Sequence, residues 1–142
     1  MLKHFEPQDF DKFDVAARNV ARSFWERLGY TCTDNDDIYA VDLLVERNGK
    51  QFGCEVEVKQ GWHGPTFPFS TLHIPLRKRK FTDGVTCFFV LNNGMTHAAI
   101  VRSSTILASP VVEVKNYKVP DGEHFYDIPA SEVQVLNIIA EK

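Results

Sequence analysis

Charged and apolar side chains alternate along residues 54–59 in a pattern that could do chemistry. Successive side chains of a β-strand point to opposite faces. One face of this stretch would therefore carry three polar residues: Glu55, Glu57 and Lys59. Two carboxylates on one face repel each other, which a purely structural strand has little reason to accept, whereas a divalent cation turns the repulsion into attraction. The alternation therefore indicates a site for a hard cation such as Mg²⁺.

The preceding segment would bring a third carboxylate to the same place. Asn48-Gly49 is a strong signal for a two-residue hairpin turn, because both residues tolerate positive φ. We expect Tyr39–Arg47 and Lys50–Gln60 to pair as antiparallel strands on either side of this turn. Asp42 is the only acid in the middle of the first strand, within an apolar run, and is the third candidate ligand.

The hairpin also predicts which carboxylates meet. A two-residue loop places Asp42 opposite Glu55, and Glu57 then lies on the diagonal. A bulge at Gly53 would slide Glu57 opposite Asp42 instead, because a glycine inside a strand often marks a bulge. In either register the three carboxylates and the lysine share one patch, with oxygen ligands and space for the waters that Mg²⁺ retains.

Asp42 followed by Glu57-Val58-Lys59 on the next strand resembles the D…(D/E)xK signature of the PD-(D/E)XK nuclease superfamily. The likeness is nearest to small Holliday-junction resolvase-like endonucleases of archaea and phages. In those proteins a helix that ends in Gly-aromatic precedes an acidic strand, a turn and an E-V-K strand, much as Arg22–Tyr30 leads into this hairpin. The resemblance covers about residues 11–102. Ala40-Val41 stand where the family usually has a proline.

The resemblance implies a Mg²⁺-dependent endonuclease that hydrolyses phosphodiester bonds in DNA, on branched or otherwise structured substrates, with Mn²⁺ able to replace Mg²⁺. Asp42 and Glu57 would hold the metal ion, and Glu55 would be a further or alternative ligand. Lys59 would orient the attacking water or neutralise charge in the transition state. The lysine offset favours Glu57 over Glu55 as the partner of Asp42.

A helix is expected before the hairpin, from about residue 11 to Leu28, with a stop at Gly29. Apolar side chains recur at three- and four-residue steps and predict one buried stripe: Phe13, Ala17, Val20, Phe24 and Leu28. Another face carries polar residues at steps of four: Asp14, Arg18 and Arg22. These fit a solvated ladder of ion pairs. Family members often carry an acid near the metal on this helix, which makes Asp14 a catalytic candidate.

Two segments after the acidic strand could contact nucleic acid. Residues 61–69 form a loop in which Trp62 and His63 could stack on an unpaired base, or the loop could only cover one end of the sheet. His63 could also assist proton transfer. Pro75 is expected to open a short helix that carries the only dense basic run, for phosphate binding or as a solvated face: Arg77, Lys78, Arg79 and Lys80.

Further strands are indicated by short apolar runs, of which the first is buried on both faces and therefore central. They are Val85–Leu91, His97–Val101, Val111–Val114 and Phe125–Ile128, with Val133–Ile139 a strand or a short helix. The predicted fold class is α/β: a central mixed β-sheet flanked by helices, as in a restriction-endonuclease-like core, with a β-rich C-terminal extension. We expect a single domain over residues 1–142, with the core at about 11–102 and the extension at about 103–142.

Composition limits the classes of protein that remain. The chain has 142 residues, 44% of them hydrophobic, and a formal net charge of −3, which argues against non-specific coating of nucleic acid. Its three cysteines lack the spacing of a zinc site and are expected to be reduced: Cys32, Cys54 and Cys87. No apolar run approaches the roughly 20 residues of a membrane span. We therefore expect a cytoplasmic protein, in the host cell if it is viral, that binds DNA and no membrane.

Three questions stay open at this stage. The chain could be a non-catalytic nucleic-acid or protein-binding module that keeps the nuclease fold and an acidic patch. It could also act on another phosphodiester, such as RNA. The oligomeric state is undetermined, with a homodimer among the possibilities.

Overall fold

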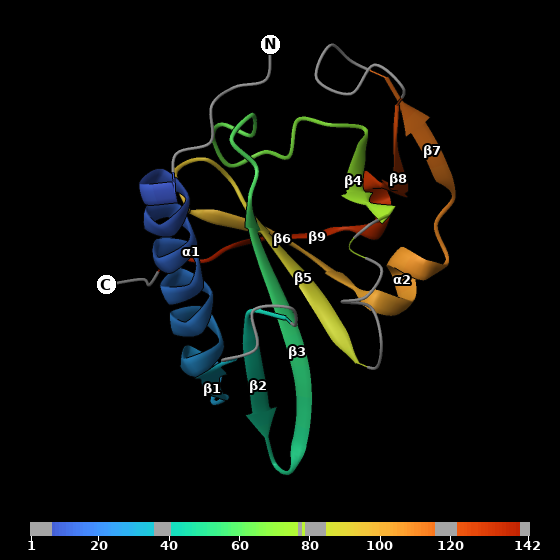
Figure 1. Ribbon diagram of the computed structural model, residues 1–142. Coiled ribbons are helices and arrows are strands. Elements are labelled where there is room, and N and C mark those ends of the chain that lie inside the picture. Colours follow the sequence, from blue (N-terminus) through green and yellow to red (C-terminus); the bar gives the residue numbers. More distant parts are fainter. Residues whose placement is uncertain (1–6, 36–40, 77, 79–84, 116–121, 140–142) are drawn as a thin grey trace.

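The computed structural model describes residues 7–35, 41–76, 78, 85–115 and 122–139, with side chains from residue 15 onward. A six-stranded sheet forms the middle layer, with helix α1 on one face and a three-stranded sheet with helix α2 on the other (Figure 1). The helices are α1 (Pro7–Arg27) and α2 (Ser103–Leu107). The strands, in chain order, are β1 (Thr31–Asp34), β2 (Leu43–Arg47), β3 (Lys50–Val58), β4 (Thr71–Pro75), β5 (Thr86–Leu91), β6 (His97–Arg102), β7 (Val111–Val114), β8 (Glu123–Pro129) and β9 (Gln134–Asn137).

The large sheet has the strand order β1-β2-β3-β5-β6-β9, and the small sheet has the order β4-β8-β7. Strand β5 runs parallel to β3 and antiparallel to β6. Every residue of β5 is buried, which confirms the prediction of a central strand for Thr86–Leu91, whereas Val85, the first residue of the predicted run, is exposed and precedes the strand. The prediction of a mixed central sheet in an α/β protein is therefore confirmed. Strand β9 resolves the open alternative for residues 133–139 in favour of a strand.

Helix α1 packs on the sheet through a stripe that differs in part from the predicted one. Its buried residues are Ala17, Ala21, Phe24 and Trp25. Leu28 is 49% exposed, so its predicted burial is wrong, because α1 ends at Arg27 and Leu28 belongs to the turn that follows. Gly29 ends the helix as predicted, with a φ of +91° that favours glycine. The side chains of Phe13 and Asp14 lie outside the described residues.

The β2–β3 hairpin forms in the predicted register. Arg47 pairs with Lys50, and Asn48 and Gly49 have φ values of 55° and 77°, as a tight turn requires. The pairing continues without a bulge past Gly53, so the alternative register is wrong. Gly53 is needed for a different reason: a Cβ there would lie 2.8 Å from a methyl group of Val41.

The second sheet is the main departure from the predicted architecture. Strand β4 was not predicted, and Pro75 is its last residue instead of the first residue of a helix. Proline is tolerated there because β4 is an edge strand of the small sheet. Strands β7 and β8, expected in a separate C-terminal extension, pair with β4 over the large sheet, and β9 joins the large sheet itself. One face of the central sheet is thus covered largely by strands and not by helices.

Two apolar cores follow from this layering. The first lies between α1 and the large sheet and includes the Phe24, Trp25 and Phe89 rings. The second lies between the two sheets, around Trp62 and Phe88, and extends to Ile106 of α2. Of the helices that the structure describes, none combines the length and apolar character that crossing a membrane requires.

Candidate functional site

The polar face of β3 points toward the small sheet. In the parallel pairing of β3 with β5, Glu55 lies beside Phe88 and Glu57 beside Val90, and both apolar partners belong to the core between the sheets. The backbone N–H of Lys59 donates to the Leu91 carbonyl oxygen at 2.8 Å, which extends the β3–β5 pairing by one residue. The alternation predicted from the sequence is thus observed, with Cys54, Val56 and Val58 on the α1 side.

Asp42 and Glu55 are brought together by the hairpin register. Leu43 pairs with Cys54, so Asp42, one residue earlier, stands beside Glu55, one residue later. The Val56 backbone N–H donates to Asp42 Oδ2 at 2.9 Å and holds this carboxylate in place. Burial, followed by the hydrogen bond and the negative charge of Asp42, raises the pKa of Glu55 from its ordinary value of 4.5 to about 8.

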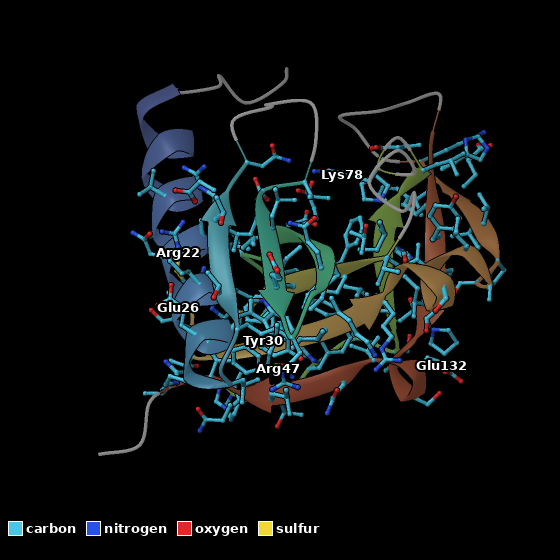
Figure 2. All side chains as sticks on the ribbon, turned by 90° about the horizontal axis from the view of Figure 1, so that it is seen from below. Arg22, Glu26, Tyr30, Arg47, Lys78 and Glu132 are labelled. Carbon is cyan, nitrogen blue, oxygen red and sulfur yellow. The ribbon has the colours of Figure 1, made fainter. Side chains whose placement is uncertain are left out.

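Lys78 supplies the charge that faces this pair. Its Nζ donates to Glu55 Oε2 at 3.0 Å, and the Glu55 side chain is only 6% exposed, against 26% for Lys78. Figure 2 shows Lys78 beside β3, on the side away from α1. Leu76 and Lys78 adopt 3₁₀ conformation directly after β4. The rest of the predicted phosphate-binding run lies outside the described residues: Arg77, Arg79 and Lys80.

Glu57 and Lys59 occupy the next positions on the same face. Both side chains are half-buried. The Lys59 Nζ lies 5.0 Å from the centre of the Phe69 ring, in a cation–π contact. Phe69 comes just before β4 and Lys78 just after it, so one unpredicted strand positions a partner for each of two ionisable residues on β3. No local signal in the sequence indicated either contact.

The aromatic loop after β3 has a structural role at Trp62. Trp62 has no exposed surface, its Nε1 donates to the Thr66 carbonyl oxygen at 2.9 Å, and its ring packs edge-on against Phe67. The prediction that Trp62 stacks on a base is therefore wrong, and the alternative, a cover for the end of the sheet, describes this ring. His63 is exposed. Trp62 is buried because the loop folds back over the core between the sheets.

Arg22 on the polar face of α1 forms an ion pair with Asp34 of β1 (Figure 2 labels Arg22). The ladder predicted within the helix stays a prediction, because it depends on Asp14. Asp14 is on α1, but its side chain is outside the described residues, so its predicted place near the metal stays a prediction.

A separate cavity of about 660 Å³ opens on the α1 side of the sheet. Its wall is mostly aromatic and aliphatic, with Phe24, Trp25 and Phe52 among the lining residues, and Arg102 and Ser104 among the polar ones. Among the residues that the structure describes with side chains, none of those predicted for catalysis or nucleic-acid binding lines it. The acidic site and this cavity are therefore distinct features of the molecule.

The chain matches no protein-family model and no curated protein. Its function therefore has to be argued from the geometry of the site.

Proposed function

We propose that the chain is a Mg²⁺-dependent DNA endonuclease of the PD-(D/E)XK type that hydrolyses phosphodiester bonds. The observation that supports this most directly is the convergence of Asp42, the residue just before β2, with Glu55 of β3, in a largely buried position next to an ammonium group. Buried like charges are costly in a structural role, and perturbed carboxyl groups of this kind concentrate at functional sites. The elements α1, β1, β2, β3 and β5 would form the restriction-endonuclease-like core.

The donor set fits Mg²⁺ in particular. Within the described ranges, no group of three or more acidic, histidine or cysteine side chains is arranged to hold a metal ion. Mg²⁺ is usually held by one or two carboxylates, with water and substrate phosphate oxygens as its other ligands. Asp42 and Glu55 offer such a pair of hard oxygen donors, and a divalent cation would offset the burial and the negative charge of Asp42 that raise the pKa of Glu55.

Each residue of the face would have a defined role. Asp42 and Glu55 would hold the ion, because the hairpin register joins these two carboxylates, with Glu57 as an outer acid on the same face. The two carboxylates would hold an ion whose Lewis acidity would activate water and offset the charge on the scissile phosphate. Lys59 would direct its ammonium toward the reacting phosphate, and the Phe69 ring would limit the conformations of its side chain. Asp14 would be an outer acid of the same site.

The proposed DNA contacts involve the basic run that follows β4 and the aromatic loop of residues 61–69. Arg77, Arg79 and Lys80 would bind backbone phosphates, and exposed His63 would stand at the rim of the site. Branched or otherwise structured DNA is the proposed substrate on the strength of the family resemblance. Mn²⁺ would replace Mg²⁺ because it accepts the same oxygen donors.

One observation favours a second candidate function. When Glu55 is ionised, Lys78 Nζ, 3.0 Å from its Oε2, neutralises the buried carboxylate without any metal. A module that had kept the fold for binding nucleic acid or protein, and had lost catalysis, would benefit from such a permanent neutralisation. Under that alternative the chain binds its partner equally well with and without Mg²⁺.

Cleavage of plasmid and branched DNA in Mg²⁺, in Mn²⁺ and in EDTA separates the two functions. The nuclease proposal expects metal-dependent cleavage that is absent in EDTA and strongly reduced in an Asp42→Asn variant purified in the same way. The matched control is Asp34→Asn, which removes a carboxylate from the Arg22 ion pair on the opposite side of the sheet from Glu55. Binding of DNA with no cleavage in either metal would replace the nuclease by the binding module.

A further inference from the structure

Lys78 occupies a position that matters to any cation binding at the site. Its Nζ lies 3.0 Å from Glu55 Oε2, at hydrogen-bonding distance, and so already satisfies an oxygen that a metal ion would need. Glu55 is 6% exposed, so the space around its carboxylate is limited. Two cations cannot both contact one carboxylate oxygen in a buried setting without strong mutual repulsion.

The two members of the ion pair differ in how they are held. Glu55 is fixed on β3, a central strand that lies between β2 and β5 in the large sheet. Lys78 reaches it from the segment that follows edge strand β4, and a quarter of its side chain faces solvent (26%). A lysine stem is long and flexible and keeps its ammonium well hydrated when it swings outward. The exchange of partners therefore involves movement of the Lys78 side chain, while Glu55 stays on its strand.

We propose that Lys78 is a built-in counter-cation that takes the place of the metal ion at Glu55 in the free protein, so that Mg²⁺ and the Lys78 ammonium compete for this carboxylate. The inference rests on the proposed metal site and adds a residue that regulates its occupancy. Once displaced, the Lys78 ammonium would take a substrate phosphate as its new partner. Binding of DNA then strengthens binding of Mg²⁺, and by linkage the reverse also holds.

Titration calorimetry with Mg²⁺ alone tests the competition on the full chain. Lys78→Gln keeps a hydrogen-bond donor for Glu55 and removes the charge. This variant should bind Mg²⁺ about tenfold more tightly than wild type, because a charge-assisted contact with Glu55 no longer has to be broken. The matched control is Lys115→Gln, which removes the same charge from an exposed pair with Glu113 and should leave the Mg²⁺ affinity unchanged. Equal affinity in wild type and Lys78→Gln, or an equal gain in the control, overturns the proposal.

A second measurement follows Lys78 in the wild-type protein, and a variant is needed only to assign its signal. The side-chain ¹³Cε signal of Lys78, assigned with a Lys78→Arg spectrum, should shift during a Mg²⁺ titration with the midpoint found by calorimetry. The signal of Lys115 should stay constant. A Lys78 signal that does not move when Mg²⁺ saturates the protein overturns the competition.

The outcomes also separate this inference from the proposed function. Mg²⁺ binding with displacement of Lys78 and no cleavage of DNA supports the competition and rejects the nuclease. Cleavage that requires Mg²⁺, with Lys78 unmoved and its Gln variant unchanged in affinity, supports the nuclease and rejects the competition. No Mg²⁺ binding by wild type at millimolar concentrations rejects both.

Discussion

On each face of strand β3, one of its ionisable side chains interacts with an ionisable side chain of a neighbouring segment. The two pairs differ in what their burial does to the stability of the fold. On the α1 face, Cys54 stands in register with Cys87 of β5, and both are buried. On the face toward the small sheet, Glu55 stands beside Asp42 of the hairpin. The hydrogen bond with Cys87, followed by burial, raises the pKa of Cys54 well above its ordinary value.

The two pairs differ in the free energy that their burial costs at pH 7. A thiol is neutral at pH 7 before and after folding, so a further rise in its pKa changes nothing there. A glutamate is charged in the unfolded chain at pH 7, and burial next to Asp42 forces it to take a proton or to find a cation. Burial of the pair on the α1 face therefore does not reduce the stability of the fold at pH 7. Burial of Glu55 on the opposite face does reduce it, by a free energy that a bound cation would offset. Costs of this kind are expected at functional sites and not in a structural core.

The largest effect is expected from the α1 face and should appear in stability. Phe89 is fully buried there, and its ring centre lies 5.4 Å from that of Phe24. Phe89→Ala should lower the free energy of unfolding by about 3–5 kcal/mol, through lost burial and a residual cavity. Urea denaturation measures this loss. Glu55→Gln, as the comparison on the other face, should cost far less at pH 7, and an equal loss in both variants would break the contrast between the faces.

The next effect is expected on the site face and should appear in catalysis. Asp42→Asn should reduce cleavage by about 10²–10³-fold, the range typical of a lost electrostatic group in an active site, and should abolish stabilisation by Mg²⁺. Glu55→Gln should weaken Mg²⁺ binding more than Glu57→Gln, because Glu55 is the direct neighbour of Asp42. Calorimetric titration of the three variants ranks them. A larger loss for Glu57→Gln would show that the sequence motif, and not the hairpin register, selects the ligands.

Lys59 should affect turnover and leave the fold intact. Its side chain is half-buried on the site face and contacts the Phe69 ring. Lys59→Ala should slow single-turnover cleavage by about 10²-fold, with little change in DNA affinity or in melting temperature. Phe69→Leu is the companion variant, because it removes the ring but keeps the lysine, and a smaller loss is expected. Cleavage by Lys59→Ala at the wild-type rate would exclude this lysine from the reaction.

A further effect concerns the dependence of stability on pH. Glu55 has a folded-state pKa of about 8 against an ordinary value of 4.5, so the folded chain binds the extra proton between these limits. The stability that this bound proton contributes is fully present below about pH 4.5 and is lost as the pH rises through about 8. The free energy of unfolding changes over this range by at most about 1.4 kcal/mol per pH unit for one proton. In urea unfolding between pH 5 and pH 9, the free energy of unfolding of wild type should fall with this slope relative to that of Glu55→Gln. The Cys54 pair contributes nothing until the pH approaches 9, the ordinary value for its thiol.

The parts of this structure that were predictable are those whose signals are local. Asn48-Gly49 determines the turn, and the turn determines the register, so the meeting of Asp42 with Glu55 followed from neighbouring residues alone. The continuous apolar run of β5 likewise indicated a central strand.

The parts that were missed depend on distant segments. Strand β4 has five residues and ends in proline, and it is a strand because β8, more than forty positions later, pairs with it. The Lys78–Glu55 ion pair spans 23 positions and depends on where β4 lies. Helix α2 has only five residues, too few for a periodic pattern to form. Trp62 could be placed in a loop from the sequence, but its burial required knowledge of the second sheet.

The dependence of β4 on β8 has a consequence for the order in which the chain acquires its chemistry during synthesis. The acidic hairpin involves only nearby residues and can form as soon as the segment up to β3 has been made. The strand that positions Lys78 gains its hydrogen-bonded neighbour only after the ribosome has added Glu123–Pro129. During that interval a nascent chain would carry a carboxylate pair without its lysine, open to any divalent cation nearby. Completion of the small sheet would therefore act as a late maturation step that protects an exposed acidic patch.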